Sequence, residues 1–413
     1  MTPSDEDGLS RRELLATGLA IGTAAAGAQA AASDGARPTA IVVGAGAFGG
    51  WSALHLLRLG YSVTLVEAWG AGHSRSSSGG ETRVIRGSYG ARGVYTRLVA
   101  RALELWRGFD RVRGTQLFRP AGVLWLSGQD DTFVRDSVAQ LTTAGIPHER
   151  LTAPEGAGRW PQIDWSGIES ALFEPESGYL FARRACAEVA AAFAAEGGRR
   201  VHAEARPAIA RGRGAVELAD GRRLEADRVL FACGPWLPRL FPELLGDKIR
   251  PTRQEVFFFG TPAGDSRFEV PSLPVWADPT GDRFFYGIPD AESRGFKIAD
   301  DTHGADFDPA TGDRTPSAEG LERARAFLAK RFPALAGAPL VESRVCQYEN
   351  SPDSHLVFAR HPEAENLWVL GGGSGHGFKL GPALGEHVAA ALAGEIGPEQ
   401  EFSLARFASP PRG

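Results

Sequence analysis

The sequence predicts an α/β fold in which one domain is assembled from separated segments and an aromatic β-sheet is inserted between them. Three observations support this prediction. A strand, a glycine-rich turn, a helix and a second strand follow one another over residues 39–67. A second glycine-rich turn follows a strand near the other end of the chain, at residues 367–379. Between the two turns, residues 254–288 are rich in aromatic side chains in a β-like pattern.

The composition indicates a globular protein with a small-molecule ligand. A chain of 413 residues with 43% hydrophobic residues is long enough for two domains with their own cores. A net charge of -5 provides no basic stripe, so nucleic acid is not an expected partner. Cys186, Cys233 and Cys346 are odd in number and far apart, which argues against a disulfide framework.

The first thirty-two residues have the pattern of an export signal. Arg11 and Arg12 precede a weakly apolar run from Leu14 to Ala26, and the sequence AQA follows at 28–30. This pattern is typical of a twin-arginine signal peptide with an A-x-A cleavage site. It predicts a periplasmic or secreted protein. The alternatives are an Ala-rich tail and a membrane anchor, but the run is shorter than the roughly 20 residues of a bilayer span. We therefore expect no membrane span in the mature protein.

The first glycine-rich turn predicts a dinucleotide site. The strand Thr39 to Val43 leads into GAGAFG at residues 44–49, and a helix to residue 59 precedes a second strand that ends at Glu67. The glycines allow backbone N–H groups to approach a diphosphate at the positive end of the helix, and the acid can accept hydrogen bonds from a ribose. This motif does not distinguish FAD from NAD. The residues expected to contact the dinucleotide here are Gly44, Gly46, Phe48, Gly49 and Glu67.

Further elements are predicted along the chain. Helical spacing of apolar residues occurs over 94–109 and 184–196, and a third helix, capped by Thr315 and Pro316, extends to Phe332. Asp220 and Gly221 are a hairpin signal between strands over 215–219 and 222–232. The two glycine turns at opposite ends of the chain indicate one nucleotide domain built from separated segments.

Four stretches together resemble the monomeric sarcosine oxidase and N-methyltryptophan oxidase family. They are GAGAFG with its terminal Glu67, SSGGETRVIR from Ser77 to Arg86, RVCQY from Arg344 to Tyr348, and GSGHGFK from Gly373 to Lys379. The resemblance implies a glutathione-reductase-like, Rossmann FAD-binding domain with an inserted α+β substrate domain built on a large mixed sheet. The implied FAD-binding segments are 37–118, 169–240 and 340–408, and the implied substrate-domain segments are 119–168 and 241–339.

The resemblance also implies that FAD is joined covalently to the sulfur of Cys346. A buried cysteine that serves only as a small hydrophobe is the alternative. The neighbouring Arg344 is expected to help stabilise a thiolate, and no chemistry is assigned to Cys186 or Cys233. In addition to the residues of the first turn, the expected FAD contacts are Ser77, Thr82, Arg83, Arg86, Cys346, Gly373, Gly375, His376, Gly377, Phe378 and Lys379.

By the same resemblance, Arg83 and Lys379 hold the carboxylate of an amino acid substrate. Two cations around a carboxylate would fix the donor C–H over the flavin and leave the amine free. Tyr286 and Tyr348 match aromatic pocket residues. The alternatives are ordinary surface charges for the cations and simple packing for the tyrosines.

Lys297 matches the family lysine that promotes the reaction with oxygen, and a lysine at an exposed sheet edge is the alternative. Arg83, Lys297 and Lys379 are therefore the expected catalytic residues. Two departures alter the pocket: small-substrate members of the family carry histidine where this chain has Gly79 and Asp301. A larger secondary or primary amino acid is thus as compatible with the sequence as sarcosine.

The predicted activity is FAD-dependent oxidation of a secondary or primary amino acid by hydride transfer to flavin N5. The products are an imine and, with molecular oxygen as acceptor, hydrogen peroxide. One alternative is an exported amine dehydrogenase that uses another electron acceptor. Another is an FAD-binding protein without turnover. No metal site is predicted.

Overall fold

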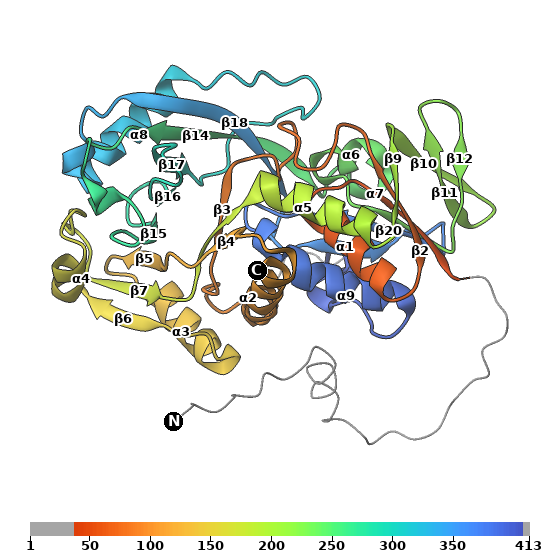
Figure 1. Cartoon of the computed structure of the whole chain (residues 1–413), viewed down its shortest axis with the longest axis horizontal. Helices are drawn as coiled ribbons and strands as arrows, with labels where there is room; N and C mark the ends of the chain where they lie inside the picture. The colour runs from red at the N-terminus through yellow and green to blue at the C-terminus, as the bar shows by residue number, and fades with distance from the viewer. Residues whose placement is uncertain (1–36, 408–413) are drawn as a thin grey trace, which may run out of the picture. The chain divides into compact units, whose positions relative to one another are not determined.

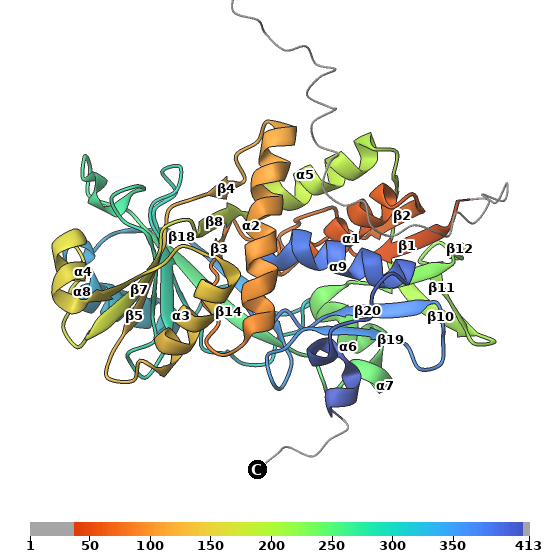
Figure 2. The ribbon, with the colours of Figure 1, turned by 90° about the horizontal axis from the view of Figure 1, so that it is seen from below.

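The computed structural model describes residues 37–407, and the predicted export signal at residues 1–32 lies outside this range. The described strands form a six-stranded sheet, an eight-stranded sheet and two three-stranded sheets. Figures 1 and 2 show the eight-stranded sheet at one end of this part of the chain and the six-stranded sheet at the other.

The six-stranded sheet has the order β19-β20-β13-β1-β2-β9, and all neighbours are parallel except β19 and β20. Its strands are β1 (Thr39–Val43), β2 (Ser62–Glu67), β9 (Arg199–His202), β13 (Arg228–Phe231), β19 (Val357–Arg360) and β20 (Leu367–Gly371). Because β1, β2, β13 and β20 are parallel, their carboxyl ends meet at one edge of the sheet. Both glycine turns therefore come together at this edge with Glu67.

Both faces of the central strand β1 are apolar, as expected for a parallel strand covered on both sides. Ala40 and Val42 belong to the core formed with the helices, whereas Ile41 and Val43 pack in a second core on the other face. Helices lie on the first face and a small sheet with short helices lies on the second (Figure 2). These elements are α1 (Ala47–Arg58), α2 (Gly93–Arg113), α5 (Ala182–Ala195) and α9 (Gly381–Ala393), and β10 (Ala205–Ala210), β11 (Arg213–Leu218), β12 (Arg223–Leu224), α6 (Leu237–Leu240) and α7 (Pro242–Leu245).

Glycine allows two helices of the first face to approach closely. A Cβ at Gly385 in α9 would lie 2.7 Å from the backbone of Trp51 in α1. None of the helices between residues 37 and 407 combines the length and apolar character needed to cross a membrane.

The eight-stranded sheet is mixed, with the order β18-β14-β17-β16-β15-β5-β7-β6 and one parallel pair, β15 and β5. Its strands are β5 (Val123–Ser127), β6 (Glu149–Thr152), β7 (Ser170–Glu174), β14 (Arg250–Phe259), β15 (Val275–Asp278), β16 (Phe285–Ile288), β17 (Phe296–Asp300) and β18 (Leu340–Asn350). Helix α8 (Ala318–Arg331) packs Ala324 and Leu328 into an aromatic core with this sheet.

The remaining elements are α3 (Thr132–Ala144), α4 (Ala153–Arg159) and a small sheet of β3 (Thr82–Ile85), β8 (Gly178–Phe181) and β4 (Phe118–Arg119). The division into FAD-binding and substrate segments stays a prediction. Strands β7 and β18 lie at the start of two predicted FAD-binding segments, yet both belong to the eight-stranded sheet. There β7 lies between β5 and β6, and β18 pairs with β14.

The predicted α/β class with a large mixed sheet is confirmed, and two local expectations need correction. The hairpin signal at Asp220 and Gly221 joins β11 only to the two-residue β12, and the chain then leaves to form β13 beside β1. The cap of α8 is Ser317, whose side chain accepts a hydrogen bond from the Gly320 N–H, rather than Thr315 and Pro316. A serine hydroxyl can satisfy an unpaired first-turn N–H, whereas proline cannot accept through its side chain.

Candidate active site

The first glycine turn depends on two close backbone approaches. Gly44 has φ +101°, and a Cβ there would lie 2.5 Å from the carbonyl oxygen of Ala232. A Cβ at Gly49 would lie 1.9 Å from the carbonyl oxygen of Gly44. Helix α1 can therefore begin directly against the end of β1, and no acidic residue lies in its first turn. This arrangement leaves a positive helix end for an anionic group.

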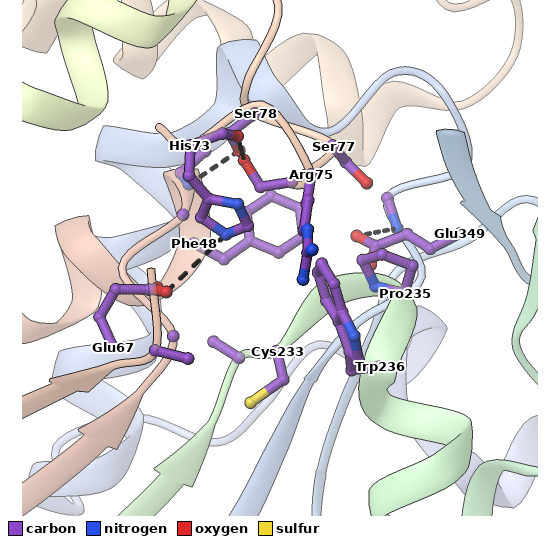
Figure 3. A pocket seen from close by; sticks show the side chains of 18 of the residues that line it. Phe48, Glu67, His73, Arg75, Ser77, Ser78, Cys233, Pro235, Trp236 and Glu349 are labelled. Carbon is purple, nitrogen blue, oxygen red and sulfur yellow. Dashed lines mark hydrogen bonds and ion pairs between the residues drawn. The ribbon is translucent and has the colours of Figure 1, made fainter. Parts of the chain in front are cut away.

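A cavity of about 520 Å³ opens at this edge of the six-stranded sheet (Figure 3). It lies between the two glycine turns, as the discontinuous nucleotide domain requires. Predicted residues that line it are Gly44, Gly46, Phe48, Glu67, Ser77, Arg83, Tyr348, Gly373, Gly375, Gly377 and Phe378. Gly49 serves the packing of α1 instead of the cavity wall.

Glu67 lies at the end of β2, where a ribose acceptor is expected. Its two carboxylate oxygens accept hydrogen bonds from the N–H groups of Ala45 at 2.7 Å and Trp69 at 3.0 Å. His73, which no sequence motif indicated, lies beside it, with Nε2 3.8 Å from Glu67 (Figure 3). Burial lowers the pKa of His73. A neutral imidazole at this position adds a polar group to the cavity without repelling a ribose.

The cavity wall holds buried polar atoms that need a ligand. Within the described chain, Oγ of Ser77 and Oε2 of Glu349 have no hydrogen-bond partner. A side chain at Gly375 or Gly377 would fill space beside Tyr348 or Phe48, with Cβ contacts of 2.6 Å and 2.5 Å. Unpaired buried polar groups are costly, so these atoms fit a large ligand that carries hydroxyl and phosphate groups. FAD meets that description.

Glu349 is a second residue that the sequence analysis missed. Its side chain is 6% exposed, and Oε1 accepts a hydrogen bond from the Gly373 N–H at 3.2 Å. Burial raises the pKa of Glu349 to about 7. The available signal was its position directly after the RVCQY stretch at 344–348. A carboxyl with this pKa can donate or accept a hydrogen bond near neutral pH.

A second cavity, of about 60 Å³, adjoins the first. Arg83, Gly375 and Phe378 line both cavities. Aliphatic, aromatic and charged side chains form the rest of the small cavity. The charged and aromatic ones include Arg86, Lys379, Asp301, Trp125, Phe284, Tyr286 and His376. A space of this size holds on the order of four to six water-sized groups.

Arg83 links Cys346 to the boundary between the two cavities. Its guanidinium donates to the carbonyl oxygens of Thr82 and Ser77 and lies 3.1 Å from the sulfur of Cys346. The expectation that Arg344 stabilises this thiol is wrong. Arg344 instead pairs with Glu342 at 2.9 Å and Glu81 at 3.2 Å, because two carboxylates attract it more strongly than a thiol.

Arg86 and Lys379 are, with Arg83, the basic side chains that line the small cavity. The guanidinium of Arg86 lies over the rings of Tyr89 and Trp125, and its Nη1 has no hydrogen-bond partner in the part of the chain that the structure describes. Nζ of Lys379 donates to Tyr89 Oη at 3.0 Å and to the His376 carbonyl at 2.8 Å. Burial, followed by the charge of Arg86, holds the pKa of Lys379 well below its usual value.

Three further predicted residues lie on strands of the eight-stranded sheet: Tyr286 on β16, Lys297 on β17 and Tyr348 on β18. Lys297 is 2% exposed and donates to the carbonyl of Thr82 at 2.9 Å, so it is not an exposed sheet-edge lysine. Burial and the charge of Arg83 hold its pKa well below the usual value. Tyr286 lines the small cavity, whereas Tyr348 lines the large one. Thr82, Lys297 and Cys346 are not among the lining residues of either cavity.

The adjoining cavities define a class of protein: an enzyme that holds a small charged molecule beside a bound dinucleotide. Comparisons with known proteins are consistent with this class. The family model described as FAD dependent oxidoreductase (DAO) matches residues 39–391. In structure, the chain is similar to L-proline dehydrogenase from P. horikoshii, with a TM-score of 0.77, 22% identity, and coverage of 90% of this chain and 98% of that chain.

Two curated relatives are similar over most of their length. Monomeric sarcosine oxidase from Bacillus sp. (strain B-0618) is 30% identical over 353 residues, which are 84% of this chain and 90% of that protein. N-methyl-L-tryptophan oxidase from Salmonella arizonae is 31% identical over 389 residues, which are 89% of this chain and 98% of that protein. The chain belongs to the DAO family of FAD-dependent oxidoreductases, and within it to the sarcosine-oxidase-like enzymes of amines and amino acids.

The raised pKa of Glu349 predicts a pH-dependent stability. An unfolded glutamate ionises near pH 4.3, so between that pH and about 7 the folded chain retains a proton that the unfolded chain has lost. The free energy of unfolding should therefore fall as pH rises through this window. In the flavin-free chain, Glu349→Gln should raise it at pH 8 by about 3 kcal/mol more than at pH 4.5. Urea denaturation at the two pH values measures this difference.

Glu363→Gln, at an exposed position, is the matched control and should change the free energy of unfolding little at either pH. If Glu349→Gln has the same effect at pH 4.5 and pH 8, the carboxyl does not titrate in this window.

Proposed function

We propose that this protein oxidises a small secondary or primary amino acid at its CH–NH bond, with FAD as cofactor and oxygen as electron acceptor, giving an imine and hydrogen peroxide. The observation that carries the proposal is the cation-lined small cavity that shares Arg83, Gly375 and Phe378 with the glycine-lined large cavity. The names of two relatives, monomeric sarcosine oxidase and N-methyl-L-tryptophan oxidase, support an amino acid with a substituted nitrogen as substrate.

In this proposal the large cavity binds FAD. The first glycine turn and the start of α1 hold the diphosphate, Glu67 binds a ribose, and Ser77 and Glu349 bind hydroxyl groups. Cys346 provides the covalent attachment, supported by the guanidinium of Arg83 at 3.1 Å from its sulfur. When bound, FAD supplies the acceptor for the hydride of the substrate C–H bond.

The small cavity binds the substrate. We assign the carboxylate to Arg86 and Lys379, which revises the pairing of Arg83 with Lys379 expected from the sequence. Arg83 already donates to two carbonyl groups and contacts Cys346. Arg86 has a buried Nη1 without a partner in residues 37–407. A carboxylate would satisfy this nitrogen and draw the proton equilibrium of Lys379 toward the ammonium form.

Lys297 is proposed to promote the reaction with oxygen. Oxygen gains negative charge when it accepts electrons, and a cation about 4 Å away stabilises that charge by roughly 4 kcal/mol at an effective dielectric near 20. Only the protonated amine of Lys297 can act in this way.

We also propose export by the twin-arginine route to the periplasm or the medium, supported by the pattern of residues 1–32.

The first prediction concerns covalent flavin. After acid precipitation, the pellet of wild-type protein should be yellow, and Cys346→Ser should release its flavin to the supernatant. Cys233→Ser is the matched control, since Cys233 lines the large cavity and should leave attachment unchanged. Absorbance of pellet and supernatant gives the result. Wild-type flavin found entirely in the supernatant would exclude attachment.

The second prediction concerns the carboxylate. Arg86→Gln or Lys379→Met should lower kcat/KM for amino acids by roughly 10- to 150-fold, the effect of one lost charged hydrogen bond. Decarboxylated amines should be much less affected. Arg92→Gln, at an exposed position, is the control. Steady-state kinetics on matched acid and amine pairs measure the difference, and equal losses on both would refute the carboxylate assignment.

The third prediction separates the two half-reactions. Lys297→Met should slow reoxidation by oxygen up to roughly a thousandfold, with a much smaller effect on anaerobic reduction by substrate. Because the pKa of Lys297 is lowered, wild-type reoxidation should slow as pH rises through that lowered pKa, and Lys297→Met should lose this dependence. Stopped-flow absorbance measures both steps, with the exposed Lys330→Met as control. Reoxidation of the variant at the wild-type rate would make Lys297 a bystander.

A further inference from the structure

The small cavity is lined by one acidic side chain, Asp301, and by three basic ones, Arg83, Arg86 and Lys379. Among the described residues, no ion pair of 4.0 Å or less joins Asp301 to any of the three. Opposite charges that face one small space and are not paired with each other leave both signs available to a ligand. Such a cavity matches a molecule that carries both charges itself.

Several elements hold Asp301 in position. It directly follows β17, and its N–H donates to the carbonyl of Phe284 at 2.7 Å. Oη of Tyr348 in β18 donates to its Oδ1 at 2.5 Å. One hydrogen bond to Oδ1 leaves Oδ2 and further lone pairs available for a ligand.

The charged and titratable groups around this carboxyl come from five places in the fold. Burial raises the pKa of Asp301, while the hydroxyl of Tyr348 and the nearby cations oppose that shift. The groups that face it are Tyr348 on β18, Arg86 after β3, Lys379 in the second glycine turn, His303 in its own loop and Tyr286 on β16. A carboxylate that is more basic than usual is a better proton acceptor.

An amino acid fits these charges in one orientation. Its carboxylate goes to Arg86 and Lys379, and its amine, one carbon away, must then be bound elsewhere in a cavity of about 60 Å³. Amino acids carry an ammonium group near neutral pH, and a C–H bond beside nitrogen gives up hydride only when the nitrogen lone pair is free. A proton acceptor beside the nitrogen therefore serves the proposed reaction.

We infer that Asp301 binds the substrate's ammonium group and accepts its proton, so that the small cavity selects small zwitterionic amino acids. In this step an N–H bond breaks, an O–H bond forms on the Asp301 carboxylate, and no electrons are exchanged. The inference rests on the proposed function.

The test is the pH dependence of anaerobic flavin reduction in the holoenzyme, with the amino acid that reduces wild type most rapidly. Asp301→Asn keeps the volume and an acceptor for Tyr348. At pH 7 it should reduce its flavin about 100-fold more slowly than wild type. At pH 10, where the free amine is abundant, the deficit should shrink to less than about tenfold. Asp301→Glu, which keeps a carboxyl, should restore most of the rate at pH 7.

A control and a ligand without nitrogen separate this role from a structural one. Asp306→Asn changes an exposed aspartate of the same loop and should retain the wild-type profile. A simple carboxylate inhibitor such as acetate should bind Asp301→Asn at least as well as wild type, because repulsion is removed. Loss of the Tyr348 contact alone would weaken acetate binding and slow reduction equally at every pH.

The outcomes are distinguishable. If no amino acid reduces wild-type flavin, the proposed function fails and the inference fails with it. If wild type is reduced and Asp301→Asn has the same pH profile, only the inference is overturned. If Asp301→Asn does not fold, the profile of Asp301→Glu decides: its acid limb must move with the changed carboxyl, and an unmoved limb refutes proton acceptance.

Discussion

The antiparallel pairing of β14 and β18 is the constraint on which both cavities depend. β18 belongs to the eight-stranded sheet, yet its last residues reach the six-stranded sheet's glycine turns. The register that places Cys346 opposite Gln254 and Tyr348 opposite Thr252 fixes these side chains along one strand. Tyr348 then contacts Asp301 while Glu349 contacts the second glycine turn. A shift of one residue would exchange these faces, and Tyr348 and Glu349 would lose their contacts with Asp301 and the second glycine turn.

Burial of charge without complete pairing is the second organising feature of the site. Lys297 and Lys379 are 2% and 4% exposed, and their ammonium groups bind carbonyl and hydroxyl oxygens instead of carboxylates. Burying such groups costs free energy that the chain alone does not fully recover. The site is therefore most stable when ligands complete it. This links binding of cofactor and substrate to the stability of the fold itself.

Local patterns made much of the fold predictable. The turn at residues 44–49, the strand ending at Glu67 and the aromatic strands over 254–288 depend on neighbours in sequence, and the structure contains them. Contacts between distant residues were harder to predict. Arg83 and Cys346 are separated by 263 positions, so the chemistry of the pair depends on how two sheets meet. The adjacent Arg344 was a reasonable expectation by proximity in sequence, but nearby carboxylates attract it away.

The same reason explains the residues that were missed or reassigned. Oε2 of Glu349 and Nη1 of Arg86 are buried and have no hydrogen-bond partner in the described chain. A sequence motif carries no information about such unpaired atoms. Asp301 was recognised as a departure from the family pattern. Only the cavity shows that it shares space with three basic side chains, Arg83, Arg86 and Lys379. Composition and spacing identify which residues have chemistry, whereas tertiary contacts decide which of them face the same ligand.

The discontinuous central sheet has a consequence for the order of synthesis. β1 pairs with β13, and β13 pairs with β20, so the centre of the sheet joins the beginning, middle and last third of the chain. Until the ribosome has released residues 367–371, β13 has an unpaired edge that can pair with other chains. An amino-terminal export signal would emerge long before this edge is covered. On the proposed export route, the signal and the last strand of this sheet are therefore made at opposite ends of synthesis.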